Sequence, residues 1–290
     1  MGGVDHGVLL GWYERERRVL PWREDGVSAW GVLVSEVMLQ QTPVRRVLPV
    51  YREWMERWPT AKDLAGVPAG EAVRRWGRLG YPRRALRLHE TARILTEKHG
   101  GEVPESIEEL LRLPGVGGYT AAAVTSFAFG QRHAVLDTNV RRVFARLVGG
   151  REFPGRSLSV AEVRLAESLL PVEPAVAARW SVAVMELGAL VCTAARPLCD
   201  QCPLAASCSW LLADRPQDTI RPTGQKYEGT DRQCRGALLG VLRDAAGPVA
   251  AEELARAWSE PIRRARALDT LVADGLVEVH PDGRFSLPTT

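Results

Sequence analysis

Residues 113–120 read Leu113-Pro114-Gly115-Val116-Gly117-Gly118-Tyr119-Thr120 and lie between two stretches of helical periodicity. The glycines let the backbone adopt positive φ angles and approach a ligand closely. An alanine-rich stretch follows, so the amides of the turn and of the next helix start can face a phosphate group. An ordinary connection between two helices is the alternative. The segment is typical of a helix-hairpin-helix, with Gly115, Val116, Gly117 and Gly118 as candidate phosphate-binding residues.

Most of the chain before residue 211 has the periodicity of helices. Apolar residues recur at helical spacing in residues 32–39, 47–58, 85–95, 121–129, 140–148, 160–170 and 178–191. Prolines separate many of these stretches and mark helix ends. Almost no alternating strand pattern occurs before residue 275. The sequence therefore predicts a mainly α fold.

The last part of the chain has a different pattern. Residues 213–231 are polar and rich in turn formers, which predicts a linker. Three helical stretches then precede two short alternating runs that meet at Asp282-Gly283, a hairpin signal. This order predicts a winged-helix-like α+β module over residues 232–290. Arg263, Arg264 and Arg266 on its third helix would suit DNA, and a protein-docking role is the alternative.

Composition excludes some classes of protein. The 290 residues are enough for two or three domains, and 46% are hydrophobic. No run of about 18 uncharged apolar residues occurs, so we expect no transmembrane helix and no membrane partner. The start, MGGVDHGVLL, lacks the basic region and long apolar core of a signal peptide. We therefore expect a cytoplasmic protein.

Positive charge is concentrated locally, although the net charge is only +3. Seven arginines stand against two acids between Glu71 and Arg93. Arg141, Arg142 and Arg146 form a second group. Such local basic faces suit contact with nucleic-acid phosphates. A solvated helix face is the alternative for any one group.

Four of the five cysteines form one short pattern, C-x6-C-x2-C-x5-C, made by Cys192, Cys199, Cys202 and Cys208. Zinc ribbons tend to use two C-x2-C knuckles, whereas this pattern has one. A [4Fe–4S] cluster needs one thiolate at each of four corners and can take this spacing. Disulfides are disfavoured in a reducing compartment. We expect a [4Fe–4S] cluster, with structural zinc as the alternative and Cys234 as a free thiol.

An acidic residue follows the glycine-rich turn by about twenty positions. Asp137 stands in an apolar setting just before a helix, where an aspartate is a natural N-cap. The functional alternative is a carboxylate held near the sugar of a nucleotide whose base is removed.

These features together resemble the helix-hairpin-helix DNA glycosylase superfamily, which includes endonuclease III. That group pairs an LPGVG hairpin with an aspartate about twenty residues later, and many members carry this cysteine pattern. The string Ser35-Glu36-Val37-Met38-Leu39-Gln40-Gln41-Thr42 is similar to the signature of the MutY-type adenine glycosylases. Residues 20–23, 79–81 and 185–189 also match that subfamily. The resemblance covers roughly residues 8 to 212.

The resemblance implies a two-lobed fold. Residues 1–26 and 138–212 would form an iron–sulfur cluster lobe, and residues 27–137 a six-helix-type lobe that contains the hairpin. The linker and the winged-helix-like module would follow.

The resemblance also implies that adenine is flipped out of duplex DNA before it is removed. Glu36 would protonate adenine at N7 as the general acid, and its apolar neighbours should raise its pKa toward the working pH. A buried carboxyl paired with an arginine is the alternative. Asp137 would remain ionised and stabilise the oxocarbenium-like sugar. Asn139 would hold Asp137 or the attacking water.

Other matched positions carry implied roles. Tyr119 stands where bifunctional relatives have a lysine, and tyrosine cannot form a Schiff base. A monofunctional glycosylase without AP-lyase activity is therefore expected. Gln41, beside Gln40, would wedge into the emptied duplex. Thr42, Leu79, Gly80 and Tyr81 complete the candidate DNA contacts.

Two departures from the subfamily matter. Its members usually carry a large C-terminal domain that reads 8-oxoguanine, whereas here only about 60 residues follow the linker. The preference for adenine opposite 8-oxoguanine or opposite guanine therefore stays open. Thr138 follows Asp137 where many relatives have glycine. The alternatives are a pyrimidine-mismatch (T:G or U:G) glycosylase and a non-enzymatic iron–sulfur DNA-binding regulator. We expect a monomer that acts on double-stranded DNA in the nucleoid.

Overall fold

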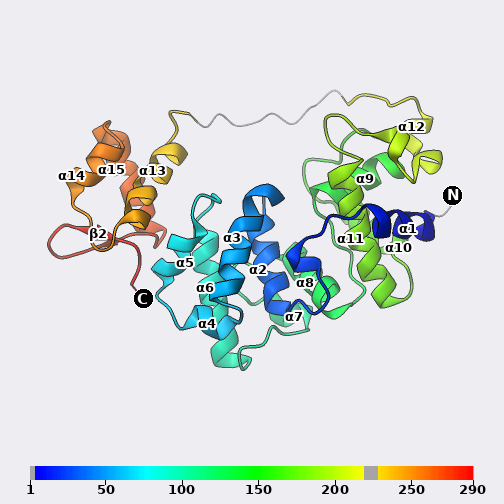
Figure 1. Ribbon diagram of the computed structural model, residues 1–290. Coiled ribbons are helices and arrows are strands. Elements are labelled where there is room, and N and C mark those ends of the chain that lie inside the picture. The colour runs from blue at the N-terminus through cyan, green and yellow to red at the C-terminus, as the bar shows by residue number, and fades with distance from the viewer. Residues whose placement is uncertain (1–3, 219–227, 290) are drawn as a thin grey trace. The chain divides into compact units, whose positions relative to one another are not determined.

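The computed structural model describes residues 4–218 and 228–289. In this part of the chain, helices dominate, and the named strands form one two-stranded hairpin near the C-terminus (Figure 1). The mainly α fold predicted from periodicity is therefore confirmed. Residues 219–227 of the predicted linker lie outside the described residues.

Internal packing divides the chain into two compact units. The first unit contains the described residues of 1–27, 105–108 and 117–222. The second contains the described residues of 28–104, 109–116 and 223–290. The domain limits predicted from the sequence stay a prediction.

Over its described residues, the first unit is built on five longer helices and several short elements. Its elements are α1 (His6–Glu16), the 3-10 turn η1 (Pro21–Arg23), α8 (Gly118–Phe129), α9 (Thr138–Leu147), α10 (Val160–Leu169), α11 (Pro174–Leu190), η2 (Cys199–Gln201), η3 (Ala205–Ser207) and α12 (Ser209–Leu212). Helix α7 (Ile107–Leu110) precedes the glycine-rich turn. Trp180 belongs to the buried core and stacks on Phe144, with ring centres 5.7 Å apart.

A buried ion cluster ties the N-terminal segment of this unit to α11. Glu186 is fully buried and accepts hydrogen bonds from Arg18 Nη2 and Arg23 Nη1, both at 2.7 Å. Arg18 also donates its Nε and its backbone N–H to the same carboxylate. Burial opposes ionisation, but the two guanidinium groups outweigh it and hold the pKa of Glu186 at about 2. The carboxylate is therefore charged and fully partnered at neutral pH.

The second unit combines a helical layer with the C-terminal module. Its elements are α2 (Ala29–Leu39), α3 (Val44–Arg57), α4 (Ala61–Ala65), α5 (Ala69–Trp76), α6 (Arg83–Lys98), α13 (Asp231–Asp244), α14 (Ala251–Ala257), α15 (Pro261–Ala273), β1 (Glu278–Val279) and β2 (Phe285–Ser286). Apart from Ser35 and Glu36, helix α2 is made of apolar residues and glycine, and it is almost fully buried, as helices that are apolar all round must be. Trp54 anchors the core through edge-to-face contacts with Trp58 at 4.9 Å and Trp76 at 5.5 Å.

The C-terminal module has the predicted winged-helix-like order. Three helices precede the antiparallel pair β1–β2, in which Val279 faces Phe285. An isolated bridge between Val249 and Phe285 adds a further short pairing. Gly283 has a φ of 80° in the hairpin turn, which explains the Asp-Gly signal. Cys234 is buried in this module, and burial raises the pKa of its thiol.

In the two described ranges, no helix combines the length and the apolar character needed to cross a bilayer.

Candidate active site

Glu36 occupies the buried helix of the second unit. It lies in α2 and is 5% exposed, between residues that are themselves buried. Ser28 is the N-cap of the helix, and its Oγ accepts from Gly31 N at 3.1 Å. An acidic side chain is seldom placed in such an apolar helix for stability. The burial of Glu36 predicted from its neighbours is confirmed.

The turn after α2 has an unusual backbone. Gln40 is the C-cap, and Gln41 has a φ of 53°, in the left-handed region that non-glycine residues seldom adopt. Thr42 is buried, and its Oγ1 donates to Gln40 O at 3.2 Å. The Gln41 side chain is exposed. Strain of this kind persists where the surrounding structure imposes it, often at a ligand contact.

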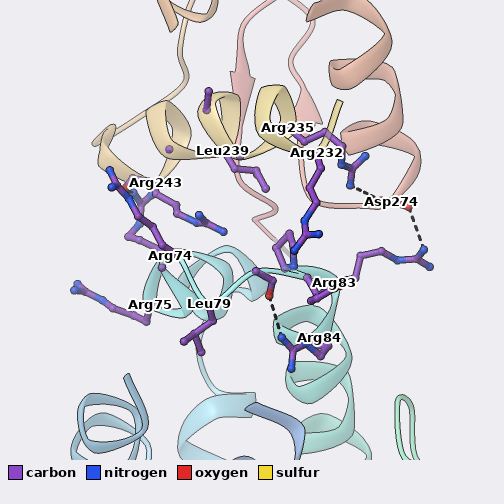
Figure 2. A pocket seen from close by; sticks show the side chains of 18 of the residues that line it. Arg74, Arg75, Leu79, Arg83, Arg84, Arg232, Arg235, Leu239, Arg243 and Asp274 are labelled. Carbon is purple, nitrogen blue, oxygen red and sulfur yellow. Dashed lines mark hydrogen bonds and ion pairs between the residues drawn. The ribbon is translucent and has the colours of Figure 1, made fainter. Parts of the chain in front are cut away.

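Arg84 from α6 holds this turn in place. Its Nη1 donates to Val37 O at 2.8 Å and to Gln40 O at 2.7 Å, and its Nη2 donates to Thr42 Oγ1 at 3.0 Å. These bonds satisfy carbonyls that the end of α2 leaves open. Burial lowers the pKa of Arg84 to about 10, so the group stays charged at neutral pH. Figure 2 shows Arg84 at the N-terminal end of α6.

The same arginine reaches the second predicted DNA-contact turn, residues 79–81. Arg84 Nη2 donates to Gly80 O at 3.2 Å, and its guanidinium lies 5.4 Å from the Tyr81 ring centre. Gly80 and Tyr81 have φ values of 89° and 49°. The Leu79 side chain is buried, whereas Tyr81 is 46% exposed. Arg84 thus links two strained turns, and sequence reasoning counted it only as one of a basic group.

The glycine-rich turn leads directly into α8. Gly115 has a φ of 78°, and Val116 N donates to Leu113 O at 3.2 Å. Gly117 is the N-cap of α8 and supplies no side-chain cap for its first amides. Gly115, Gly117 and Gly118 are exposed, whereas Val116 is buried. An uncapped, exposed helix start of this kind can receive an anion.

Asp137 of the first unit is the N-cap of α9, as the structural alternative predicted. Its Oδ1 accepts from Val140 N at 2.6 Å, and its Oδ2 accepts from Asn139 Nδ2 at 2.8 Å. Burial raises the pKa of Asp137, while these donors and the Arg142 charge oppose the rise. Asn139 therefore touches Asp137 as predicted. Tyr119 lies half-buried near the start of α8, in a small apolar cluster with Val135 and Met185.

A chain of hydrogen bonds continues from Asp137 to the cysteine loop. Asn139 Oδ1 accepts from Arg142 Nη2 at 2.8 Å, and Arg142 Nε donates to Cys192 O at 2.8 Å. Arg142 also donates to Gly188 O at 2.7 Å. A Cβ at Gly188 would lie 2.7 Å from Asn139 Cβ, so this packing requires glycine.

The second arginine group is therefore not a solvent-facing basic surface. Arg142 and Arg146 are buried, and their guanidinium groups donate mainly to backbone carbonyl oxygens. Arg141 pairs with Glu162 at 2.9 Å. The expectation that this group forms an exposed phosphate-binding face is wrong. The side chains of Arg142 and Arg146 are hydrogen-bonded to carbonyl oxygens inside the first unit, and that of Arg141 is paired with Glu162.

The four cysteines share one loop whose chemistry suits a metal cluster. Cys192, Cys202 and Cys208 pack against the first unit's core. Burial raises the pKa of Cys202 to about 11, and the nearby Cys192, Cys199 and Cys208 add to the rise. Arg146 Nη1 lies 3.4 Å from Cys192 Sγ. Within the described ranges, no three His, Cys, Asp or Glu side chains are arranged as a metal site. The donor set still fits a metal, since all four thiols are half-buried and burial raises the pKa of Cys202 and Cys208, so that these two would ionise readily only beside a metal ion.

Comparisons with known proteins agree with these features. Residues 34–165 match the family of HhH-GPD superfamily base excision DNA repair proteins. The adenine DNA glycosylase of Mycolicibacterium smegmatis is 51% identical over 281 residues, which cover 96% of this chain and 94% of that protein. This chain belongs to the adenine DNA glycosylase family. The Mycobacterium tuberculosis H37Rv adenine DNA glycosylase is 52% identical over 97% of this chain and 92% of its own length. The human one is 46% identical over 70% of this chain and 38% of its length.

Solved structures support the same fold for this adenine DNA glycosylase family member. A thermostable thymine-DNA glycosylase superimposes with a TM-score of 0.64 at 29% identity, covering 72% of this chain and 95% of that one. An endonuclease III–DNA complex gives 0.60 at 27% identity, covering 73% of this chain and 95% of that one. The endonuclease III-like fold expected from the hairpin and the cysteine loop is confirmed.

Proposed function

We propose that this protein is a base-excision repair enzyme that hydrolyses the N-glycosidic bond of mispaired adenine in duplex DNA. The observation that carries this proposal is the placement of Glu36. A carboxyl group is buried in an apolar helix that ends at the strained Gln40-Gln41 turn. The family membership supports adenine as the base that is removed.

Glu36 would act as the general acid. Adenine is a poor leaving group as an anion, so protonation at N7 lets it depart as a neutral base. Gln41 would fill the gap left in the duplex when adenine is flipped out. The exposed side chain and imposed backbone of Gln41 support that role.

Asp137 would carry the complementary charge. As adenine leaves, positive charge develops on the sugar, and a carboxylate beside C1′ stabilises it or bonds to it briefly. Donors from Val140 N and Asn139 Nδ2 favour the ionised form against the effect of burial. Water then supplies a hydroxyl to C1′, and the products are free adenine and an abasic site.

Tyr119 supports a monofunctional enzyme. Strand cleavage by a bifunctional glycosylase needs an amine that forms a Schiff base with the opened sugar. The tyrosine hydroxyl cannot do this, although it could assist Asp137. We therefore expect abasic DNA that breaks only after alkali is added.

The four cysteines, Cys192, Cys199, Cys202 and Cys208, would hold a [4Fe–4S] cluster. When bound, the cluster closes the loop through four thiolates and serves as a structural tie. The loop would then present the exposed Arg196 to the phosphate backbone. Iron and acid-labile sulfide in equal amounts in the purified protein would support this assignment, and bound zinc would contradict it.

An excision assay tests the proposal. The protein is given duplexes containing A:8-oxoguanine, A:G, T:G and U:G, with Glu36→Gln as the test variant and the exposed Glu90→Gln as control. We expect adenine release from the first two duplexes, loss of release in Glu36→Gln with duplex binding retained, and normal release in the control.

The same assay separates the alternatives. Release of thymine or uracil alone would identify a pyrimidine-mismatch glycosylase. Binding without release of any base would identify an iron–sulfur DNA-binding regulator. Full activity of Glu36→Gln would overturn the mechanism. We also propose that the enzyme acts as a monomer on nucleoid DNA in the cytoplasm, which size-exclusion chromatography with and without duplex can check.

A further inference from the structure

A wide groove in the second unit is lined mainly by arginines. Its volume is about 1960 Å³, and its walls are formed by the α5–α6 region and by α13 of the C-terminal module. Ten arginines and three acidic residues line it. Figure 2 shows arginines projecting from both walls. Gln40, Gln41 and Tyr81 also contribute to the lining.

The C-terminal module is joined to the α5 side by an exchange of arginines. Arg74 Nη1 donates to Ala245 O at 2.9 Å, just past the end of α13, and also to Arg243 O. In return, Arg243 Nε donates to Val73 O at 3.1 Å. Each guanidinium therefore satisfies carbonyls beyond or near the C-terminal end of the opposing helix.

A second contact closes the same junction. Gly70 N donates to Pro288 O at 2.8 Å, and a Cβ at Gly70 would lie only 2.4 Å from that oxygen. The chain end is thus packed directly on the start of α5. Together with the Arg74 and Arg243 bonds, this contact attaches the C-terminal module, of which α13 is part, to α5.

The positive charge of the groove is only partly neutralised by the carboxylates that line it. Arg83 and Arg235 share Asp274, at 3.2 and 2.5 Å. Arg84 and Arg243 donate to carbonyl oxygens, which are dipoles and remove no net charge.

Two exposed arginines stand on opposite walls of this groove. Arg78 belongs to the α5–α6 segment, and Arg232 lies on α13 with its guanidinium 5.2 Å from the Tyr81 ring centre. Like charges gathered around one groove repel each other, so an anionic ligand would relieve that repulsion. Guanidinium groups pair well with phosphate oxygens.

The sequence suggested that the third helix of the module, α15, contacts DNA, and not the first helix, α13. Arg263 and Arg266 of α15 both pair with Asp231, at 3.4 and 2.6 Å. Arg264 donates to Trp258 O at 2.7 Å. The third-helix arginines thus serve contacts inside the module, and its first helix lines the groove.

We propose that this groove binds the phosphate backbone of duplex DNA, with Arg78 and Arg232 as phosphate contacts on its two walls. The groove shares lining residues with the turns that contact DNA in the proposed function. Gln41 and Tyr81 belong to the turns assigned to DNA under the proposed function, on which this choice of ligand rests. DNA held at those turns would carry its backbone through the groove. The C-terminal module therefore contributes to DNA affinity through α13.

The test measures binding to an undamaged duplex, so that it needs no excision. The double variant Arg78→Gln/Arg232→Gln is compared with Arg93→Gln/Arg256→Gln, which removes the same charge from exposed positions outside the groove. Anisotropy titrations run from about 50 to 200 mM salt. Each lost phosphate contact lowers the slope of log affinity against log salt by about 0.9, so the groove variant should lose about 2. We expect affinity to fall by about tenfold at the upper salt concentrations and the control to match the parent protein.

Several outcomes would overturn the inference. An unchanged slope would show that the groove takes no phosphate, and tighter binding would show that α13 covers the DNA surface instead. A loss seen only with single-stranded DNA would refute the duplex assignment. If a thermal melt shows that the double variant is unfolded, the single variants Arg78→Gln and Arg232→Gln are measured instead. Each should reduce the salt slope by about half as much as is expected for the double variant. These binding measurements do not depend on excision, so they still test the groove if the protein does not release adenine.

Discussion

Arg84 provides the sharpest test of how the site is held together. We predict that Arg84→Met destabilises the second unit and slows adenine excision. Its guanidinium donates to Val37 O, Met38 O, Gln40 O, Thr42 Oγ1 and Gly80 O, and it is 7% exposed. Methionine matches the length of the side chain but leaves these acceptors without their donor.

The magnitude follows from two opposing effects. Five bonds from a charged donor, at a net ~1.5 kcal/mol each, would contribute about 7 kcal/mol. Burial lowers the pKa of Arg84 from its ordinary value to about 10, which corresponds to about 3 kcal/mol against the charged form. Two nitrogens serve all five acceptors, so the bonds are not independent and we expect a net loss of about 3 kcal/mol.

Thermal unfolding and single-turnover excision measure the effect. A loss of about 3 kcal/mol should lower Tm by about 6–12 °C for a unit of this size. Arg93→Met on the same helix removes an exposed arginine that pairs only with Glu97 in the described contacts, and it should change Tm little.

Arg84→Lys keeps the positive charge but has one ammonium group instead of the two Nη donors. Its Tm should therefore lie between the Tm of the parent protein and that of Arg84→Met. Because Arg84 positions the Gln41 turn, the excision rate of Arg84→Met should be reduced even at temperatures at which the variant is still folded. Equal Tm values for the Arg84→Met and Arg93→Met variants, with normal excision, would refute the reasoning.

Three further predictions concern the first unit. The folded pKa of Glu186 lies below its ordinary value, so its contribution of about 3 kcal/mol is present above pH 4.5 and is lost as pH falls toward 2. Glu186→Gln should lower Tm at neutral pH and flatten the Tm profile over that acid range, and a parallel profile would contradict this. The raised folded pKa of Asp137 means that its ionised form disfavours folding, and asparagine can still cap α9. Asp137→Asn should therefore abolish excision with Tm unchanged or higher, and a lower Tm would show that the carboxylate is structural. Cys199→Ser should reduce iron content and DNA affinity before it affects the excision rate of the DNA-bound enzyme, and full iron content would exclude Cys199 as a ligand.

Local patterns predicted the helices well, because burial of one apolar face imposes its period on the sequence. Residues 85–95 and 178–191 indicated α6 and α11, whose observed bounds differ from these by at most four positions at either end. The short helices α4 and α5 were not predicted, since five and eight residues carry too little of a period. Their ends depend on the Thr60 capping box and on Pro68.

The roles of the arginines could not be read from the chain. Sequence reasoning grouped them by proximity and expected basic faces. In the structure, Arg84 and Arg142 are buried and hold carbonyls, whereas Arg78 and Arg232 are exposed on one groove. A guanidinium has the same charge in both settings. The two settings differ in the acceptors within reach, and most of the acceptors of Arg84 and Arg142 come from residues distant in sequence.

The sequence by itself determined the helical fold, the glycine-rich turn, the cysteine loop and the burial of Glu36. These are local properties, set by period, spacing and the character of immediate neighbours. Only the tertiary structure decided that Arg84 links the 40–42 and 79–81 turns, that Arg142 links Asp137 to the cysteine loop, and that α13 rather than α15 lines the groove. The first two links depend on the bonds Arg84–Gln40 and Arg142–Cys192, whose partners are more than 40 residues apart and come within about 3 Å only when the chain has packed. The lining of the groove depends on how the C-terminal module packs on α5 and α6.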